Sequence, residues 1–113
     1  MAKGWCVGLL ARRVDALEKI AGDHENALPL PADIADLAQV DAAVAAMVNK
    51  WGHLDALFNN AGIFTPQGSI DEIDVNDWHQ SVSVNLTGMF NAARVAFAQM
   101  RAQNPQGGRI INN

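Results

Sequence analysis

Short apolar runs alternate with amphipathic stretches along the whole of this 113-residue chain. Each apolar run has the length of a strand and carries little or no charge, as expected for strands that helices cover on both faces. This alternation predicts an α/β protein with a mainly parallel sheet. The runs expected as strands are WCVGLLA (5–11), ALPLP (27–31), LDALF (54–58) and RIINN (109–113).

Two of the intervening stretches predict helices with recognisable ends. The first covers about residues 14–21, and Gly22 is a suitable C-terminal cap. The second covers about residues 36–51. Asp36, with Gln39 three residues later, resembles a capping box that satisfies the free N–H groups of a first turn.

A longer helix is expected from about residues 74–77 to Gln103, where NPQGG (104–108) breaks it. Apolar residues recur along it at helical spacing, which is most simply explained by packing against the core. The residues of this stripe are Trp78, Val82, Leu86, Phe90, Ala93, Phe97 and Met100.

Composition and charge exclude several classes of protein. Half of the residues are apolar and 18% are charged, which predicts one globular domain over residues 1–113. The net charge is −4 and no basic stripe is present, which argues against nucleic acid as the main partner. No apolar run is long enough to span a bilayer.

The single cysteine and the three histidines give no sign of a disulfide or a metal site. Cys6 lies within the first apolar run, so we expect it to be buried, as suits a reducing cytoplasm. His24, His53 and His79 show no ligand spacing with one another or with the cysteine, so no metal is expected.

Two asparagines follow the third apolar run directly. Asn59 and Asn60 begin the segment NNAG, although asparagine is depleted in strands and a buried amide without partners costs about 1–3 kcal/mol. Either the pair turns the chain or it holds something. Ligands of open parallel sheets bind beyond the carboxyl ends of the strands, which favours the second interpretation.

Arg12 and Arg13 follow the first strand, where a nucleotide-binding fold selects its cofactor. A carboxylate at this place bonds the ribose hydroxyls of NAD, whereas an arginine meets the 2′-phosphate of NADP. Two adjacent guanidinium groups therefore favour NADP over NAD. The alternative is a solvated basic turn whose arginines pair with Asp15 and Glu18.

Several segments together resemble the short-chain dehydrogenases/reductases. NNAG (59–62) is similar to a signature of that family, and DWHQSVSVNLTGMF (77–90) resembles its helix with the active-site asparagine. Similarity continues through VGLLARRVDALEKIA (7–21), LPADIAD (30–36) and GGRIINN (107–113) and so covers essentially the whole chain. The resemblance implies part of a Rossmann-like α/β/α three-layer fold.

The resemblance also implies roles for individual residues. Asn59 would tie neighbouring strands together, and Asn85 would hold a water in the family's proton relay. The alternative for Asn85 is a polar residue at a helix irregularity. Cofactor contacts are implied for Asp33 and Ile34 at the adenine, and for Asn60, Ala61 and Gly62 at the ribose on the nicotinamide side.

The chain departs from the family pattern in two respects. The family opens with a strand and a glycine-rich turn that holds the pyrophosphate, but only MAKG precedes the first apolar run. The family's chemistry also uses a serine, a tyrosine and a lysine, and this chain contains no tyrosine. We therefore expect part of an NADP-preferring oxidoreductase for alcohols or carbonyls that is inactive by itself. The alternative is a non-catalytic association module or a remnant without function.

The absent first strand affects the expected sheet. In the strand order 3-2-1-4-5-6 it would be the central one, between the first and third strands present here. Those two strands either pair directly or present open edges, and open edges invite association with another chain. We therefore expect a homodimer or larger assembly through a sheet edge, through helix 77–103, or through both.

Overall fold

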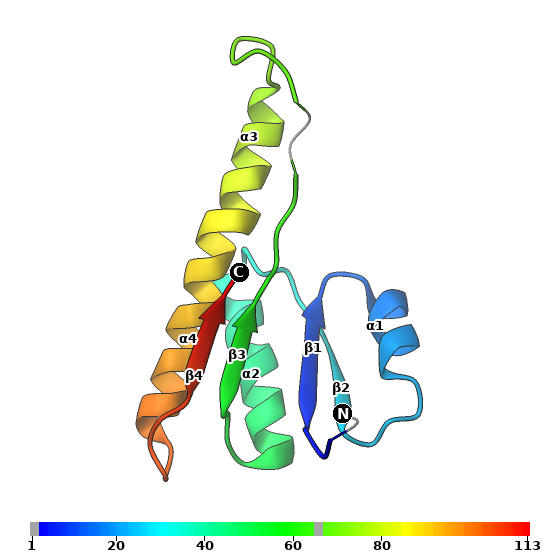
Figure 1. Ribbon diagram of the computed structural model, residues 1–113, viewed down its shortest axis with the longest axis vertical. Coiled ribbons are helices and arrows are strands. Elements are labelled where there is room, and N and C mark those ends of the chain that lie inside the picture. Colours follow the sequence, from blue (N-terminus) through cyan, green and yellow to red (C-terminus); the bar gives the residue numbers. More distant parts are fainter. Residues whose placement is uncertain (1–2, 65–66) are drawn as a thin grey trace.

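The computed structural model describes residues 3–64 and 67–113, in which helices and parallel strands alternate (Figure 1). The expected α/β fold with parallel strands is confirmed. In chain order the elements are β1 (Val7–Ala11), α1 (Val14–Ala21), β2 (Ala27–Pro31), α2 (Leu37–Trp51), β3 (Ala56–Asn59), α3 (Val75–Val82), the π-helix η1 (Ser83–Gly88), α4 (Met89–Ala102) and β4 (Arg109–Asn112).

The four strands form two separate parallel pairs. β1 pairs with β2, and β3 pairs with β4. No ladder joins β1 to β3, although Leu10 of β1 and Leu57 of β3 pack against the same buried cluster, which contains Val40. Of the two arrangements expected for these strands, the structure has the one with open edges.

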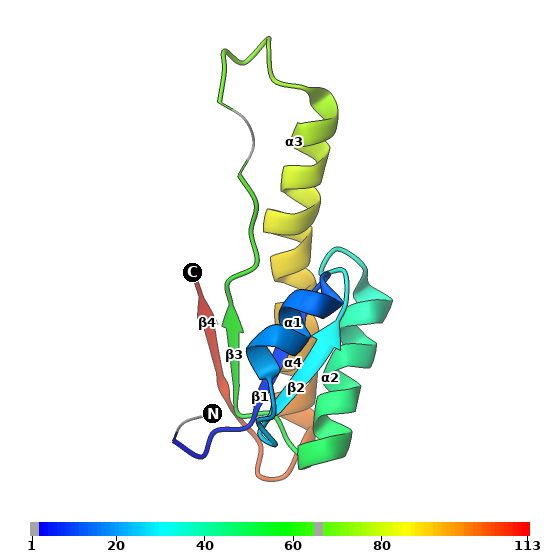
Figure 2. The same ribbon diagram turned by 90° about the vertical axis from the view of Figure 1, so that its right-hand side faces the viewer.

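Helices α2 and α4 pack against each other and cover the same side of the strands (Figure 2). The core lies between these helices and the strands, and its largest fully buried side chain, that of Val40, is 1% exposed. Helix α1 packs against β1 and β2. Phe58 of β3 and Ile111 of β4 remain 63% and 52% exposed, so part of the β3–β4 pair is uncovered.

The predicted long helix consists of α3, η1 and α4 in succession, and α3 extends beyond the strands (Figure 1). The prediction that its apolar stripe packs in the core is wrong for four residues. Trp78, Leu86, Phe90 and Phe97 are 59–66% exposed, whereas Met100 is buried. Helical periodicity identifies an apolar face but does not show whether another element covers that face.

Cys6 is exposed, which contradicts the expectation that it is buried. β1 begins one residue later, at Val7, and lacks a partner on one of its two edges. Residues at this end of β1 therefore lack the cover that a neighbouring strand would provide.

The predicted capping of α2 is confirmed. The Asp36 carboxylate accepts hydrogen bonds from the backbone N–H groups of Ala38 and Gln39, at 3.0 and 3.3 Å. The Gln39 side-chain amide donates back to Asp36 at 3.1 Å. No helix in the described part of the chain is both long and apolar enough to cross a membrane.

Candidate functional site

The carboxyl ends of the strands bring most of the predicted site residues to one edge of the molecule. The Ala32 backbone N–H donates to the Ala11 carbonyl at 2.9 Å, so the ends of β1 and β2 lie side by side. Arg12 follows directly after β1, and Asp33 lies two residues after the end of β2. β3 points in the same direction as β1, so the segment after β3 also begins at the carboxyl end of its strand (Figure 1).

Arg12 and Arg13 are exposed at the turn between β1 and α1. Over residues 3–64 and 67–113, neither guanidinium lies within ion-pair distance of Asp15 or Glu18. The pairing expected for a solvated basic turn is therefore not present. Both positive charges are available to an anion.

Asp33 forms a tight turn directly after β2. Its backbone N–H donates to the Gln39 side chain at 2.8 Å, and its carboxylate accepts from the Ala35 N–H at 2.9 Å. The side chain is half-buried. The turn therefore holds a carboxylate at the strand end and fixes the direction of the following Ile34.

Ile34 is buried and is held by two residues of the long helical segment. The Asn91 side-chain amide donates to the Ile34 carbonyl at 3.0 Å. Gly88 lies so close that a Cβ built on it would be 2.6 Å from the Ile34 Cγ2 atom. A glycine is therefore needed here for the close approach of the helix to the strand-end turn.

Asn59 is a buried tie between three elements. It is 3% exposed, and its side-chain amide donates to the Met89 carbonyl of α4 at 3.0 Å and to the Asn112 side chain of β4 at 3.3 Å. These bonds give the buried Asn59 amide its hydrogen-bond partners, so it does not carry the cost of an unpartnered buried group. Asn59 thus fixes the end of β3 rather than pointing toward a ligand.

Asn60, Ala61 and Gly62 are all exposed after β3. The Asn60 side-chain oxygen accepts a hydrogen bond from the Asn113 side chain at 2.6 Å, which ties this segment to the end of β4. A Cβ on Gly62 would lie 3.3 Å from the Asn85 Oδ1 atom, a tight contact.

Asn85 lies within the π-helix and reaches back to this segment. Its side chain accepts from the Ile63 N–H at 2.7 Å and donates to the Ile63 carbonyl at 2.8 Å and to the Ser81 hydroxyl at 3.2 Å. A π-helical turn often marks a functional site, and the irregularity considered in the sequence is present. A role in a proton relay remains a prediction.

Three positioning residues were missed in the sequence. Asn91 and Gly88 hold Ile34. Gln103 holds the segment just before β3 through bonds to the Leu54 N–H and carbonyl at 2.9 and 2.7 Å. A polar residue within the apolar α4 segment was the available signal for Asn91. Its partner lies 57 residues away, so local sequence could not identify it.

The site therefore has two guanidinium groups without a carboxylate partner among the described residues, one carboxylate held in a turn, and a fixed segment that contains Gly62. Within the described residues, no group of three or more histidine, cysteine, aspartate or glutamate side chains could hold a metal ion. The arrangement is suited to binding an elongated, anionic ligand across the strand ends.

The family model of short chain dehydrogenases matches residues 1–113. Among curated proteins, trans-4-hydroxycyclohexanecarboxylate dehydrogenase from Sinomonas cyclohexanicum is 39% identical over 103 residues, which cover 91% of this chain and 38% of that protein. The levodione reductase of Leifsonia aquatica is 36% identical, with 93% and 38% covered. The chain thus spans well under half the length of these relatives.

Solved structures also match almost the whole of this chain. The 3-ketoacyl-(acyl-carrier-protein) reductase of Brucella melitensis, complexed with NADH, superposes with a TM-score of 0.90 at 31% identity, covering 98% of this chain and 47% of that one. The protein ElxO with NADP bound superposes with a TM-score of 0.86 at 26% identity, covering 98% and 46%. Dinucleotides of both kinds are therefore found among the structural neighbours.

Proposed function

This chain belongs to the short chain dehydrogenase family, and from that we propose that its strand-end residues form part of a dinucleotide site that prefers NADP. The observation that carries the proposal is the exposed pair Arg12 and Arg13, which has no carboxylate partner in the described part of the chain. Guanidinium groups bind phosphate through charge and a fixed fork of donors. The extra 2′-phosphate distinguishes NADP from NAD.

The other strand ends would contact the rest of the cofactor. Asp33 and Ile34, held by Gln39 and Asn91, would lie against the adenine. Asn60, Ala61 and Gly62 would line the ribose on the nicotinamide side, where exposed backbone allows a close approach. Asn85 would keep this second contact in place through its two bonds to Ile63.

We expect the 113-residue chain by itself to bind rather than to catalyse. NADP would supply the hydride chemistry of an oxidoreductase acting on an alcohol or carbonyl. Proton transfer in that chemistry needs a titratable group within hydrogen-bond reach, and this chain has no tyrosine for the role. Asn85 carries an amide, which does not titrate.

Calorimetric titration of the chain with NADP and then with NAD tests the proposal. Changing both Arg12 and Arg13 to alanine should weaken NADP binding about tenfold, or about 1.4 kcal/mol, and leave NAD binding unchanged. Lys19→Ala is the matched control, because Lys19 is exposed in the last turn of α1, at the end of that helix opposite to Arg12 and Arg13. Equal affinity for NADP and NAD, or no binding at millimolar cofactor, contradicts the proposal.

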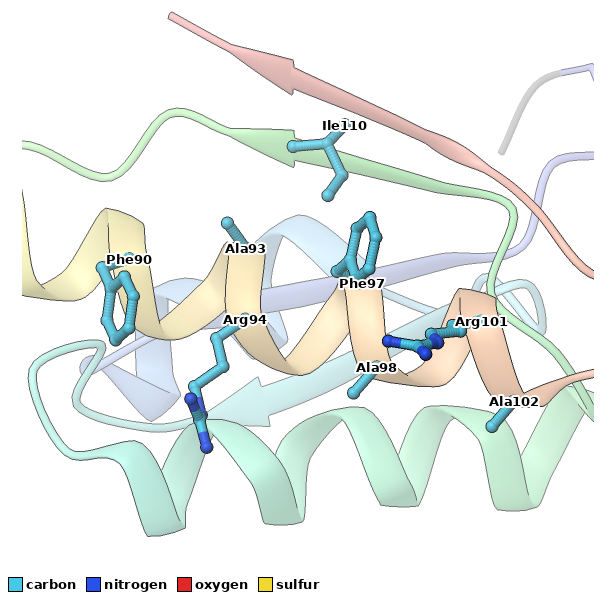
Figure 3. A pocket seen from close by; sticks show the side chains of 8 residues that line it. All are labelled: Phe90, Ala93, Arg94, Phe97, Ala98, Arg101, Ala102 and Ile110. Atoms are coloured by element: carbon cyan, nitrogen blue, oxygen red, sulfur yellow. The ribbon is translucent and has the colours of Figure 1, made fainter.

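A second proposed function is self-association through the exposed face of the long helix. Phe90 and Phe97 of α4 are 59% and 60% exposed and border a groove of about 810 Å³ (Figure 3). Ile110 of β4 lies across the groove from them, and Arg94 and Arg101 line its other side. An apolar surface framed by arginines is typical of protein interfaces.

Sedimentation velocity at micromolar concentration tests this association. Phe97→Glu places a charge within the groove and should convert a dimer into a monomer. Ile20→Glu is the control, since Ile20 is a similarly exposed apolar residue, 59% exposed, on the distant helix α1. A wild-type chain that sediments as a monomer, or a dimer that persists in Phe97→Glu, contradicts the proposal.

A further inference from the structure

The turn after β2 is held from two sides by side chains of two helices. Gln39 of α2 accepts a hydrogen bond from the Asp33 backbone N–H at 2.8 Å through its side-chain oxygen. Asn91 of α4 donates its side-chain amide to the Ile34 carbonyl at 3.0 Å and is itself only 5% exposed. Two successive residues of the turn therefore each have one backbone group fixed by a distant side chain.

The bond from Asn91 reaches the Asp33 carboxylate through a single peptide group. The carbonyl of Ile34 and the N–H of Ala35 belong to the same peptide group, which is planar. Asn91 holds its carbonyl, and its N–H donates to the Asp33 Oδ1 atom at 2.9 Å. A rotation of this peptide group would break both bonds, so Asn91 fixes the direction of the carboxylate as well as that of the backbone.

Two polar groups of the turn have no partner. The N–H groups of its other residues, Asp33, Ala35 and Asp36, all donate within the protein. Over residues 3–64 and 67–113, the Ile34 N–H has no acceptor, although Ile34 is buried, and the Asp33 Oδ2 atom accepts no bond. The turn therefore presents one backbone donor next to one carboxylate acceptor.

A donor beside an acceptor matches one edge of adenine. That edge carries a ring nitrogen, which accepts, and an amino group, which donates. Hypoxanthine has the reverse pattern, a ring N–H and a carbonyl, so it would set donor against donor and acceptor against the acceptor-only carboxylate. Polar groups left unpaired in a partly buried site cost more than a hydrogen bond gains, so the wrong base is rejected.

We propose that Gln39 and Asn91 are positioning residues that set a preference for adenine over hypoxanthine, by holding the Ile34 N–H and the Asp33 carboxylate in this pattern. Both act through the backbone of the turn. The inference rests on the proposed dinucleotide site and names what determines its base selectivity. Because Asn91 lies 57 residues from its partner, the selectivity depends on how closely the long helical segment packs against the turn.

Base selectivity is measured as a ratio of two affinities. Calorimetric titration of the full chain with NADP and with nicotinamide hypoxanthine dinucleotide phosphate should show at least about a tenfold preference for NADP. Asn91→Ala should reduce this preference to about threefold or less. A loss of stability lowers the folded fraction for both ligands alike and leaves the ratio unchanged. Leu54→Val, a change in a separate part of the core, is the control and should keep the wild-type ratio.

A second variant avoids the core. Gln39 is exposed, and Gln39→Ala frees the Asp33 N–H, so it should also lower the preference. Asn49→Ala, an exposed amide on the same helix, is its control. Asp33→Asn places a donor where hypoxanthine has its carbonyl and should lower the preference by itself. A lowered ratio in Asp33→Asn with wild-type ratios in both Gln39→Ala and Asn91→Ala overturns the inference.

The ratio of NADP to NAD affinity separates this inference from the proposed function. The double change of Arg12 and Arg13 to alanine should alter that ratio and leave the base preference intact, because the 2′-phosphate and the base are different parts of the cofactor. Asn91→Ala should do the reverse. A wild-type chain that prefers NADP over NAD but binds both bases equally overturns the inference and leaves the proposed function standing.

Amide exchange tests the positioning without any cofactor. In the ¹⁵N-labelled full chain, Asn91→Ala should accelerate exchange at Ala35 more than at Val40, which reports on α2. Leu54→Val should show no such difference. In a folded Asn91→Ala chain, Ala35 protection that falls no more than that of Val40 overturns the inference, whatever the titrations give.

Discussion

The side-chain amide of Asn85 bonds to both backbone polar groups of Ile63, 22 residues earlier in the chain, at 2.7 and 2.8 Å. The π-helix thereby acts on the segment that follows β3. This segment carries the residues proposed to meet the ribose, and the Asn85 amide fixes it at Ile63, next to Gly62.

Asn85→Ala should release this segment. Loss of two hydrogen bonds to a half-buried backbone is expected to lower the free energy of unfolding by about 1 kcal/mol, because water replaces part of them. Amide exchange at Ile63 should accelerate more than exchange in β3. Asn76→Ala is the control, since Asn76 is exposed near the start of α3. Unchanged protection of Ile63 in Asn85→Ala contradicts this role.

Gly88→Ala should disturb the turn at Ile34. A Cβ would lie 2.6 Å from the Ile34 Cγ2 atom, and overpacking of this kind costs about 1–3 kcal/mol. Chemical denaturation measures the loss. Gly68→Ala is the control, because its Cβ would make only an ordinary contact at 4.0 Å.

Partial recovery on adding Ile34→Ala to Gly88→Ala would identify the clash as the cause. The two changes should then be non-additive, since Ile34→Ala removes the side-chain atoms against which the Cβ added by Gly88→Ala would clash. Strict additivity would show that the instability of Gly88→Ala arises elsewhere in the helix.

The sequence predicted those features that local chemistry determines. Asp36 and Gln39 identified the start of α2, because a capping carboxylate bonds groups two and three residues away. The strand order of the resembled family left two arrangements possible for β1 and β3, direct pairing or open edges, and the structure has the open edges. Fold class was likewise accessible, since strand length and helical period are local properties.

Features that depend on distant partners could not be predicted. The exposure of Phe90 and Phe97 depends on which elements are present to cover α4, and periodicity is silent on that point. The pairing of Asn91 with Ile34 joins residues far apart in the sequence. Cys6 is exposed because β1 lacks a neighbour on one side, a property of the sheet rather than of the run WCVGLLA.

Asn91→Ala should destabilise the chain and loosen the adenine side of the proposed site. Asn91 is 5% exposed, and its loss leaves the Ile34 carbonyl without its donor, at a cost of about 1–3 kcal/mol. Asn49→Ala, an exposed change on α2, is the control. A denaturation midpoint equal to that of the control would contradict a structural role for this bond.

Asp36→Ala should weaken α2 at its first turn. Removal of an N-cap side chain costs about 0.5–2 kcal/mol, because the N–H groups of Ala38 and Gln39 lose their acceptor. Asp36→Ser should retain most of the stability, since serine is also a good N-cap. Asp41→Ala, an exposed carboxylate one turn later, controls for charge.

Because Gln39 also accepts from the Asp33 N–H, amide exchange at Asp33 should rise in Asp36→Ala and stay unchanged in Asp41→Ala. An unchanged rate at Asp33 in both variants would show that the cap and the strand-end turn are independent.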